Sequence, residues 1–271
     1  MRRETEDKVF RYITLIFSII ASLPLFLITL YVLYKGLPVI SWSFLTKPPE
    51  GFGANASGGI AHAIVGTIYT IIVAAFIGIP LGIFTGVFLA KRKSSRLYRY
   101  IERSVGSLLG TPSVIVGLLI YFLLVIHTGP CAFAGGVSLA IVMRPMIGEA
   151  TRIAIEALPR EIEEGGYALG AKRAQVMMDI TIPASWRGIL VGIILATGRA
   201  LGEAAPILFT SGYSEVIPRS VWDPAPTLPY VIYVYALYYP RQIYRSWARG
   251  ASAILLLLSL TLVYLSWRLR E

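Results

Sequence analysis

The chain is poor in the residues from which most metal sites and enzyme active sites are built. It has one cysteine, Cys131, and two histidines, His62 and His127, among 271 residues. A single cysteine excludes an intrachain disulfide and a cysteine-rich zinc site. The two histidines are isolated in the sequence, so neither a metal site nor a cofactor is expected. A membrane-embedded enzyme, which needs clustered acids, histidines or a nucleophile, is therefore disfavoured.

Charge is also scarce. Only 15% of the residues are charged and 56% are hydrophobic, with a mean hydropathy of +0.68. A soluble domain of ordinary composition carries about 25% charged residues. Most of the surface must therefore face a medium less polar than water, and the lipid bilayer is the natural partner. The net charge of +10 does not indicate nucleic-acid binding, because the basic residues lie in short segments between apolar runs.

Long apolar runs are what the sequence does have. Each is long enough to cross about 30 Å of hydrocarbon as a helix, and none shows the alternation of barrel strands. The first run is longer than the apolar part of a signal peptide, so we expect an uncleaved helix. The sequence predicts an all-α bundle of six transmembrane helices at about 9–34, 60–90, 104–126, 133–155, 186–210 and 250–267.

The basic residues predict how this bundle is oriented. Lysine and arginine accumulate on the cytoplasmic side of membrane proteins. If the six runs alternate in direction, 16 of the 25 basic residues fall on one side and six on the other. Both termini are therefore expected in the cytoplasm of a multi-pass cell-membrane protein.

Two outer segments, 35–59 and 211–249, contain many prolines or glycines and are expected to form loops. Within the second, the aromatic stretch Tyr230 to Tyr239 predicts a short helix at the outer surface, with an ordered loop as the alternative. Glycines four residues apart predict close helix packing. These pairs and triplets are Gly78, Gly82 and Gly86; Gly106 and Gly110; Gly188 and Gly192; and Gly198 and Gly202.

The inner segment 156–185 is too long for a simple connector. Pro159 and the acidic residues after it suit the first turn of a short helix. Gly170 permits a sharp turn, and a second short helix is expected from Ala171 to Ile180. We expect Pro183 to end that helix before the fifth transmembrane helix. The alternative is an amphipathic loop that rests on lipid headgroups.

The spacing of residues in this segment resembles a known motif. Glu164-Gly165-Gly166, Gly170, Ile180 and Ile182-Pro183 match the intervals of the motif E-A-A-x3-G-x9-I-x-L-P of binding-protein-dependent permeases. Glycines stand in place of its two alanines, and Ile182 stands in place of its leucine. The resemblance implies the type I importer fold (MetI-like) and coupling helices that contact a cytosolic ATPase. The residues expected at that contact are Glu161, Glu164, Gly165, Gly166, Ala168, Gly170, Met177, Ile180 and Pro183.

Two further stretches, 167–171 and 199–210, resemble phosphate permease subunits of the PstA type. An N-terminal helix and loop would then occupy 1–57, and the permease core 58–271. The resemblance implies a second permease subunit, two cytosolic ATP-binding subunits and an external phosphate-binding protein as partners. The chain has no phosphate-binding loop of the form G-x4-G-K-[ST], so ATP hydrolysis is expected on a separate subunit. The alternatives are a permease for another oxyanion and the sister phosphate permease.

Arg199, Glu203 and Arg144 fall well inside the predicted spans, where a charge costs roughly 2.5–3.5 kcal/mol. Glu149, Arg152 and Glu156 lie nearer the cytoplasmic end of the fourth span. Arg199 and Glu203 lie one turn apart on the fifth predicted helix, which is expected to run unbroken from Ile189 to Phe209. Arg199 is expected to line the substrate path and Glu203 to orient it, with Arg144 on the fourth helix as a weaker candidate. The alternative is an ion pair that only holds helices together.

Overall fold

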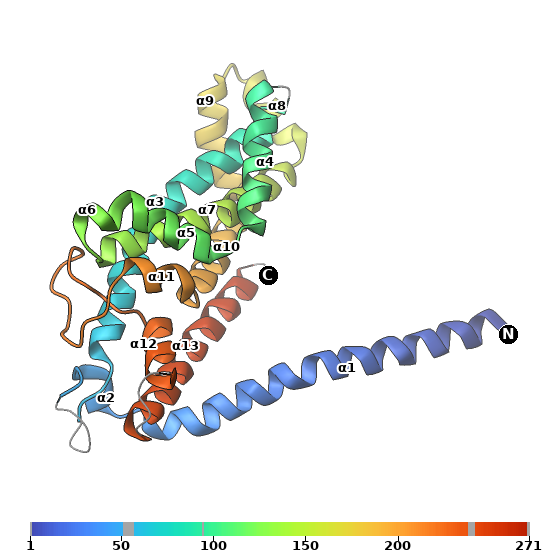
Figure 1. The fold of residues 1–271 in the computed structure, drawn as a ribbon. Helices are drawn as coiled ribbons and strands as arrows, with labels where there is room; N and C mark the ends of the chain where they lie inside the picture. Colours follow the sequence, from blue (N-terminus) through green and yellow to red (C-terminus); the bar gives the residue numbers. More distant parts are fainter. Residues whose placement is uncertain (1, 51–56, 94, 238–241, 270–271) are drawn as a thin grey trace.

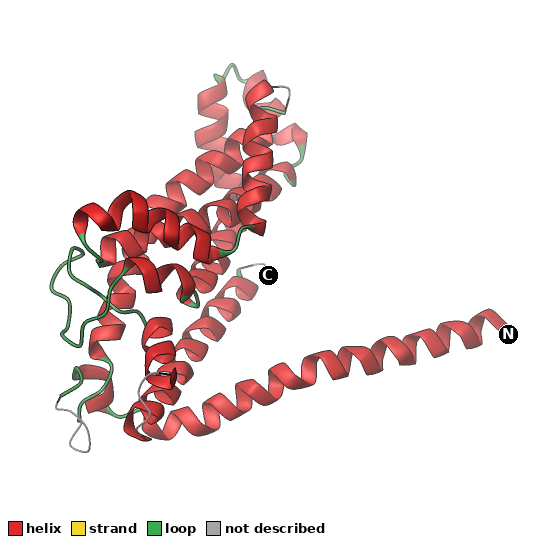
Figure 2. Cartoon of the chain, in the orientation of Figure 1, coloured by secondary structure: helices red, strands yellow, loops and turns green. Residues whose placement is uncertain are grey.

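The computed structural model describes residues 2–50, 57–93, 95–237 and 242–269, and within them the chain is built from helices. Figure 2 shows the helices and their loops. Five helices are long and apolar enough to cross a membrane, and a bent pair makes a sixth span if its members are taken together. The predicted α-helical bundle is confirmed.

The helices α3 (Ala61–Lys91) and α7 (Ala132–Glu156) form the most extensive contact of the bundle. A Cβ atom added at Gly78 would lie 3.3 Å from the Ala140 backbone, and one at Gly82 would lie 2.6 Å from the Ile147 side chain. Glycines therefore let these backbones approach closely, as their spacing predicted. Glycine also allows α10 (Ile182–Leu201) to pack closely on α7, because a Cβ atom added at Gly188 would lie 2.7 Å from Ala154.

The predicted third span is not one straight helix. It consists of α4 (Arg96–Gly110) and α5 (Ser113–Ile120), which continues through a π-helical turn (Tyr121–Val125) into α6 (Ile126–Thr128). The two arms meet at 105°. Pro112 lies at the corner, and a proline ring disfavours helical conformation in the residue before it. A Cβ atom added at Gly106 or Gly110 would meet no atom of another described element within 4 Å, so the predicted close packing is not present at these two glycines within the described residues.

The segment after α7 forms two helical arms, as predicted, but the second arm does not stop at Pro183. After α8 (Arg160–Ala168), α9 (Arg173–Gln175) continues through η4, a π-helical turn (Val176–Thr181), directly into α10. The expected helix end at Pro183 is therefore wrong. Pro183 is the second residue of α10. Proline has no backbone N–H to donate, and the wider π turn before Pro183 lets the helix continue without that hydrogen bond.

At the other end of the bundle, α12 (Leu228–Leu237) packs against α13 (Gln242–Arg268). Their contact contains the buried rings of Tyr235, Tyr244 and Trp247. The predicted short helix is therefore confirmed as a helix that contributes to a core with α13, and its place at the outer surface stays a prediction. Some predictions fall outside the described residues. They concern residues 238 and 239 of the predicted stretch, residues 51–56 of the first outer loop, and the basic residues at 241 and 270 that were counted for the orientation.

The first helix, α1 (Arg2–Gly36), projects away from the rest of the chain (Figure 1). Its last turn packs on α13, where a Cβ at Gly36 would lie 2.6 Å from Ala253. Its apolar stretch is otherwise unburied. Two short elements, η1 (Leu37–Val39) and α2 (Trp42–Thr46), lead from it into α3. The first predicted span thus exists as a helix held mainly at one end.

Candidate functional site

The pair Arg199 and Glu203 lies at a break between two helices. Helix α10 ends at Leu201, and α11 (Ala205–Thr210) begins after a gap of three residues. The prediction of an unbroken helix is wrong here. The ring of Pro206 would clash with the carbonyl of Gly202 in a continuous helix. The pair itself is present, with 3.6 Å between Arg199 Nε and Glu203 Oε1.

The Glu203 carboxylate has a second partner from another element. The hydroxyl of Ser113, the first residue of α5, donates to Glu203 Oε2 over 2.8 Å. The N-terminal end of a helix also favours a negative charge. The Glu203 side chain is only 17% exposed. Its position is therefore set jointly by the α10–α11 break and by α5.

The Arg199 side chain is open by comparison, since it is 45% exposed. Besides Glu203, its one hydrogen-bond partner among the described residues is the sulfur of Met146, at 3.5 Å. Thioether sulfur is a weak acceptor. A guanidinium carries five donors in a planar fork. Most of these donors are consequently available to an anion, which is the chemistry that this arrangement can perform.

Arg144 is not brought to this pair. Its Nε lies 3.4 Å from the hydroxyl of Thr85 on α3. Met146, which contacts Arg199, is two residues further along α7. Residues two apart on a helix point to different sides. Arg144 therefore faces α3 while the Arg199 pair faces the junction of α10, α11 and α5.

A group of ion pairs surrounds Arg152, nearer the end of α7. Its guanidinium lies 3.3 Å from Glu102 on α4, 3.6 Å from Glu149 and 3.4 Å from Glu156. Glu156 also pairs with Lys93 at 2.8 Å. The sequence showed these charges but not that they meet, because Glu102 is fifty residues away along the chain. They tie α4 to α7.

The segment with the coupling motif is stabilised by contacts between α8 and η4. Gly166 is buried, and a Cβ there would lie 2.6 Å from Ile180 and 3.1 Å from Val176. Gly170 has a φ of +80°, the left-handed region that favours glycine. The predicted turn between two helical arms is thus confirmed.

The predicted coupling residues divide into two groups. Those that face outward are Glu161, Glu164, Gly165, Ala168, Gly170 and Pro183. Those that are buried or half-buried against the neighbouring turn are Gly166, Met177 and Ile180. Sequence reasoning missed Leu169, which is 90% exposed at the same end of the molecule. Its apolar character beside a turn was the available signal. Met178, next to the expected contact residue Met177, is 63% exposed there.

Sequence reasoning also missed Glu163. Its carboxylate accepts a hydrogen bond from the buried hydroxyl of Thr181 over 3.0 Å and pairs with Lys91 at the end of α3. It therefore links α8 to both α3 and η4. No sequence signal separated Glu163 from the neighbouring glutamates of the motif.

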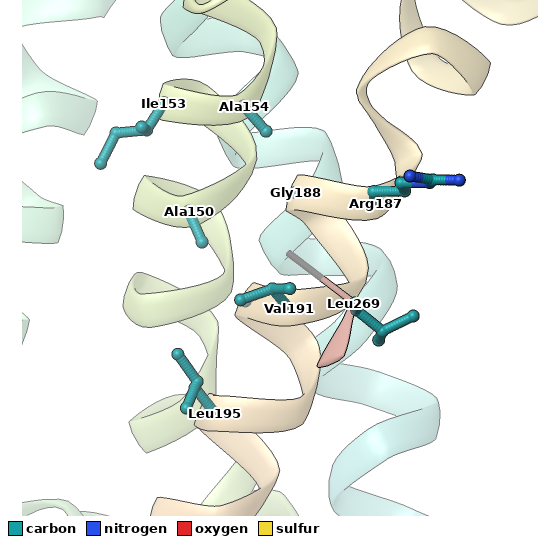
Figure 3. A pocket seen from close by; sticks show the side chains of 9 residues that line it. Ala150, Ile153, Ala154, Arg187, Gly188, Val191, Leu195 and Leu269 are labelled. Atoms are coloured by element: carbon teal, nitrogen blue, oxygen red, sulfur yellow. The ribbon is translucent and has the colours of Figure 1, made fainter. Parts of the chain in front are cut away.

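An apolar groove of about 460 Å³ lies between α7 and α10 (Figure 3). Its walls include Ala150, Ile153, Val191 and Leu195, and its one basic residue, Arg187, points away from it. The groove is mainly apolar, with Arg187 as its one basic lining residue.

Residues 78–268 match the model of the family described as "Binding-protein-dependent transport system inner membrane component". The chain is 35% identical over 233 residues to a probable phosphate transport system permease protein PstA of Methanocaldococcus jannaschii, covering 85% of this chain and 82% of that relative. It is 32% identical over 236 residues to the phosphate transport system permease protein PstA of Haemophilus influenzae, covering 86% and 83%.

Solved structures agree on the fold. A chain of the MetNI methionine ABC transporter in inward-facing conformations matches with a TM-score of 0.61 and 17% identity, over 78% of this chain and 93% of that one. A chain of a bacterial alginate ABC transporter matches with a TM-score of 0.65 and 16% identity, over 97% and 94%. The chain therefore belongs to the inner membrane components of binding-protein-dependent transport systems, and within them to the PstA permeases.

Proposed function

We propose that the chain is the permease subunit of an ATP-driven importer of inorganic phosphate, and that Arg199 meets the anion on its path. The observation that carries this proposal is the asymmetry of the Arg199–Glu203 pair. The carboxylate is fixed by Ser113 while the guanidinium is 45% exposed. The names of the relatives, which are phosphate permeases, support phosphate as the substrate.

The chemistry of the pair suits a transient contact. A phosphate that leaves water needs donors to replace part of its hydration, and a guanidinium supplies two parallel ones. Glu203 keeps Arg199 in place before the anion arrives. Its carboxylate also accepts a hydrogen bond from a phosphate that still carries a proton, whereas sulfate brings no such donor. Arg144, which is held by Thr85, is a second candidate along the path.

The exposed face of α8 and the Gly170 turn suit contact with a cytosolic ATPase. Leu169 and Met178 present exposed apolar surface there, and methionine adapts readily to a partner surface. The ATPase subunits would hydrolyse the nucleotide and push on α8. The link from Glu163 to Lys91 and Thr181 would carry that movement to α3 and α10.

The remaining partners follow from the same proposal. A second permease subunit would complete the path opposite Arg199, and an external phosphate-binding protein would deliver the anion. The excess of basic residues near the α8 end supports a cytoplasmic position for that end, and both termini are proposed to lie on the same side. The membrane would be the cell (inner) membrane.

Uptake of labelled phosphate by the reconstituted complex tests the proposal. We expect ATP-dependent phosphate accumulation that unlabelled phosphate suppresses and that equal sulfate or molybdate leaves largely intact. Stronger suppression by one of those two oxyanions would assign the chain to that substrate instead. A complex that hydrolyses ATP but accumulates none of the three would contradict the proposal.

A further inference from the structure

A second groove, separate from the Arg199 pair, lies between the end of α3 and the segment that contains α8 and η4. Its volume is about 940 Å³. Its walls are of two kinds. Phe84, Val87, Phe88 and Met177 form an apolar part, and Lys91, Arg92 and Arg173 form a basic part. None of its described lining residues is acidic.

The apolar part continues along the membrane-crossing length of α3. Leu81 and Phe84 are 50% and 69% exposed, and positions 81, 84, 88 and 91 share one face of a helix. This face changes from apolar to basic within the last turns before α3 ends at Lys91. Phenylalanine favours the hydrocarbon region of a bilayer, whereas lysine and arginine at the end of a membrane helix favour the headgroup level.

The basic part of the groove carries more positive charge than its described ion pairs neutralise. Lys91 pairs with Glu163, but Arg92 and Arg173 have no ion-pair partner among the residues that the structure describes. The two arginines come from segments about eighty residues apart in the sequence and line the same groove. Basic pockets between membrane helices on the cytoplasmic side suit anionic headgroups.

We propose that this groove binds an anionic phospholipid of the inner leaflet. The phosphate group contacts Arg92 and Arg173, and the acyl chains lie along Leu81 and Phe84. A free phosphate would use the two arginines but leave the phenylalanine face uncovered, so the amphipathic lining favours the lipid. Because the lipid contacts both α3 and the start of the α9–α10 arm, it stabilises the junction of these elements.

The experiment uses the complete transporter complex, purified from membranes that contain equal amounts of phosphatidylcholine and phosphatidylglycerol. The lipids that remain bound after detergent extraction are identified and counted by mass spectrometry. We expect phosphatidylglycerol to be enriched in the wild-type complex. The double variant Arg92→Gln with Arg173→Gln should lower that enrichment about 25-fold, since each basic residue near an anionic headgroup contributes roughly fivefold in affinity.

The matched control is Arg96→Gln with Arg99→Gln, which removes the same charge from exposed positions on α4 outside the groove. It should retain the enrichment. Equal loss in both double variants, or equal retention of the two lipids by the wild type, would overturn the proposal. Excess inorganic phosphate during extraction should not release the lipid; its release would reassign the arginines to free phosphate.

A second measurement does not depend on the stability of the charge variants. A photo-crosslinking residue in place of Phe84 should form an adduct with phosphatidylglycerol in the assembled complex. An adduct with another protein subunit would show that a protein covers this groove and would overturn the lipid site.

Discussion

Arg199 and Glu203 form one ion pair but occupy different environments. Arg199 is nearly half exposed on this chain, and among the described residues its guanidinium makes one ion pair, with Glu203, and one weak contact, with the sulfur of Met146. Holding helices together therefore does not explain why an arginine occupies position 199. It does explain the hydrogen bond between Glu203 and Ser113. A double substitution separates the two roles, because removing both charges leaves neither of them unpaired.

The neutral double variant Arg199→Gln with Glu203→Gln should assemble, reach the membrane and fail to transport phosphate. Arg199→Lys keeps the charge without the planar fork and should retain part of the transport. Labelled-phosphate uptake per assembled complex is the measurement. Arg187→Gln, also on α10 but pointing away from the neighbouring groove, is the control and should transport normally. Near-normal uptake by the double variant would leave the ion pair with only a structural role.

Gly165 and Gly166 are adjacent but differ in what surrounds them. A Cβ at Gly165 meets nothing within 4 Å, whereas one at Gly166 meets Ile180 and Val176. Gly165→Leu should therefore be tolerated, with up to about 0.8 kcal/mol gained from helix propensity. Gly166→Leu should cost about 1–3 kcal/mol through overpacking and push α8 away from η4. Limited proteolysis of α8 compares the two, and equal protection would contradict this packing.

At the scale of elements, the turn between α8 and α9 depends on the backbone of Gly170. Its Cβ position is open, so a substitution there is disfavoured by the φ of +80° and not by a collision. Gly170→Val should cost about 1–2 kcal/mol or more in this turn, whereas Gly170→Asn should be tolerated because asparagine adopts positive φ more readily.

The measurement for Gly170 is the number of phosphate ions transported per ATP hydrolysed. We expect the valine variant to lower this ratio while the amount of assembled complex stays constant, and the asparagine variant to keep it close to wild type. Equal ratios in the two variants would show that the shape of the turn does not affect coupling.

The elements that the sequence could predict are those in which one signal dominates. Hydropathy located α1, α3, α7 and α13, and the coupling-motif spacing located the turn at Gly170. Pro112 predicts a kink in the third span, but not a bend of 105°, because the apolar run continues across the proline and hydropathy does not report direction. The π turn at 176–181 was missed because it has no compositional signature, and Pro183 was consequently interpreted as a helix end.

In the candidate site, too, some features could be predicted from the sequence and others could not. The four-residue spacing of Arg199 and Glu203 was sufficient to predict that they pair, because helix geometry is local. Ser113 could not be predicted as a partner of Glu203, since that contact joins residues ninety positions apart. The same is true of Lys91 and Glu163, which are seventy-two positions apart. Long-range contacts between polar groups were the part that required the structure.

At the scale of the whole molecule, the basic residues predict which end faces the cytoplasm. A cysteine in place of Val216, which is 66% exposed, should react in intact cells with a membrane-impermeant reagent. A cysteine in place of Lys93, whose side chain is 60% exposed, should react only after the cells are permeabilised. The native Cys131 is buried and should stay silent in both. The reverse labelling pattern would invert the proposed orientation.

The isolation of α1 has a consequence for how unfolding is measured. Cooperative unfolding requires contacts between the parts that unfold together, and α1 packs on the rest of its own chain mainly through its last turn (Figure 1). We therefore expect its detachment and the melting of the other helices to be separate thermal transitions. All five tryptophans, at 42, 186, 222, 247 and 267, lie after α1. Tryptophan fluorescence therefore follows mainly the second transition, whereas a probe placed on α1 itself would record the first.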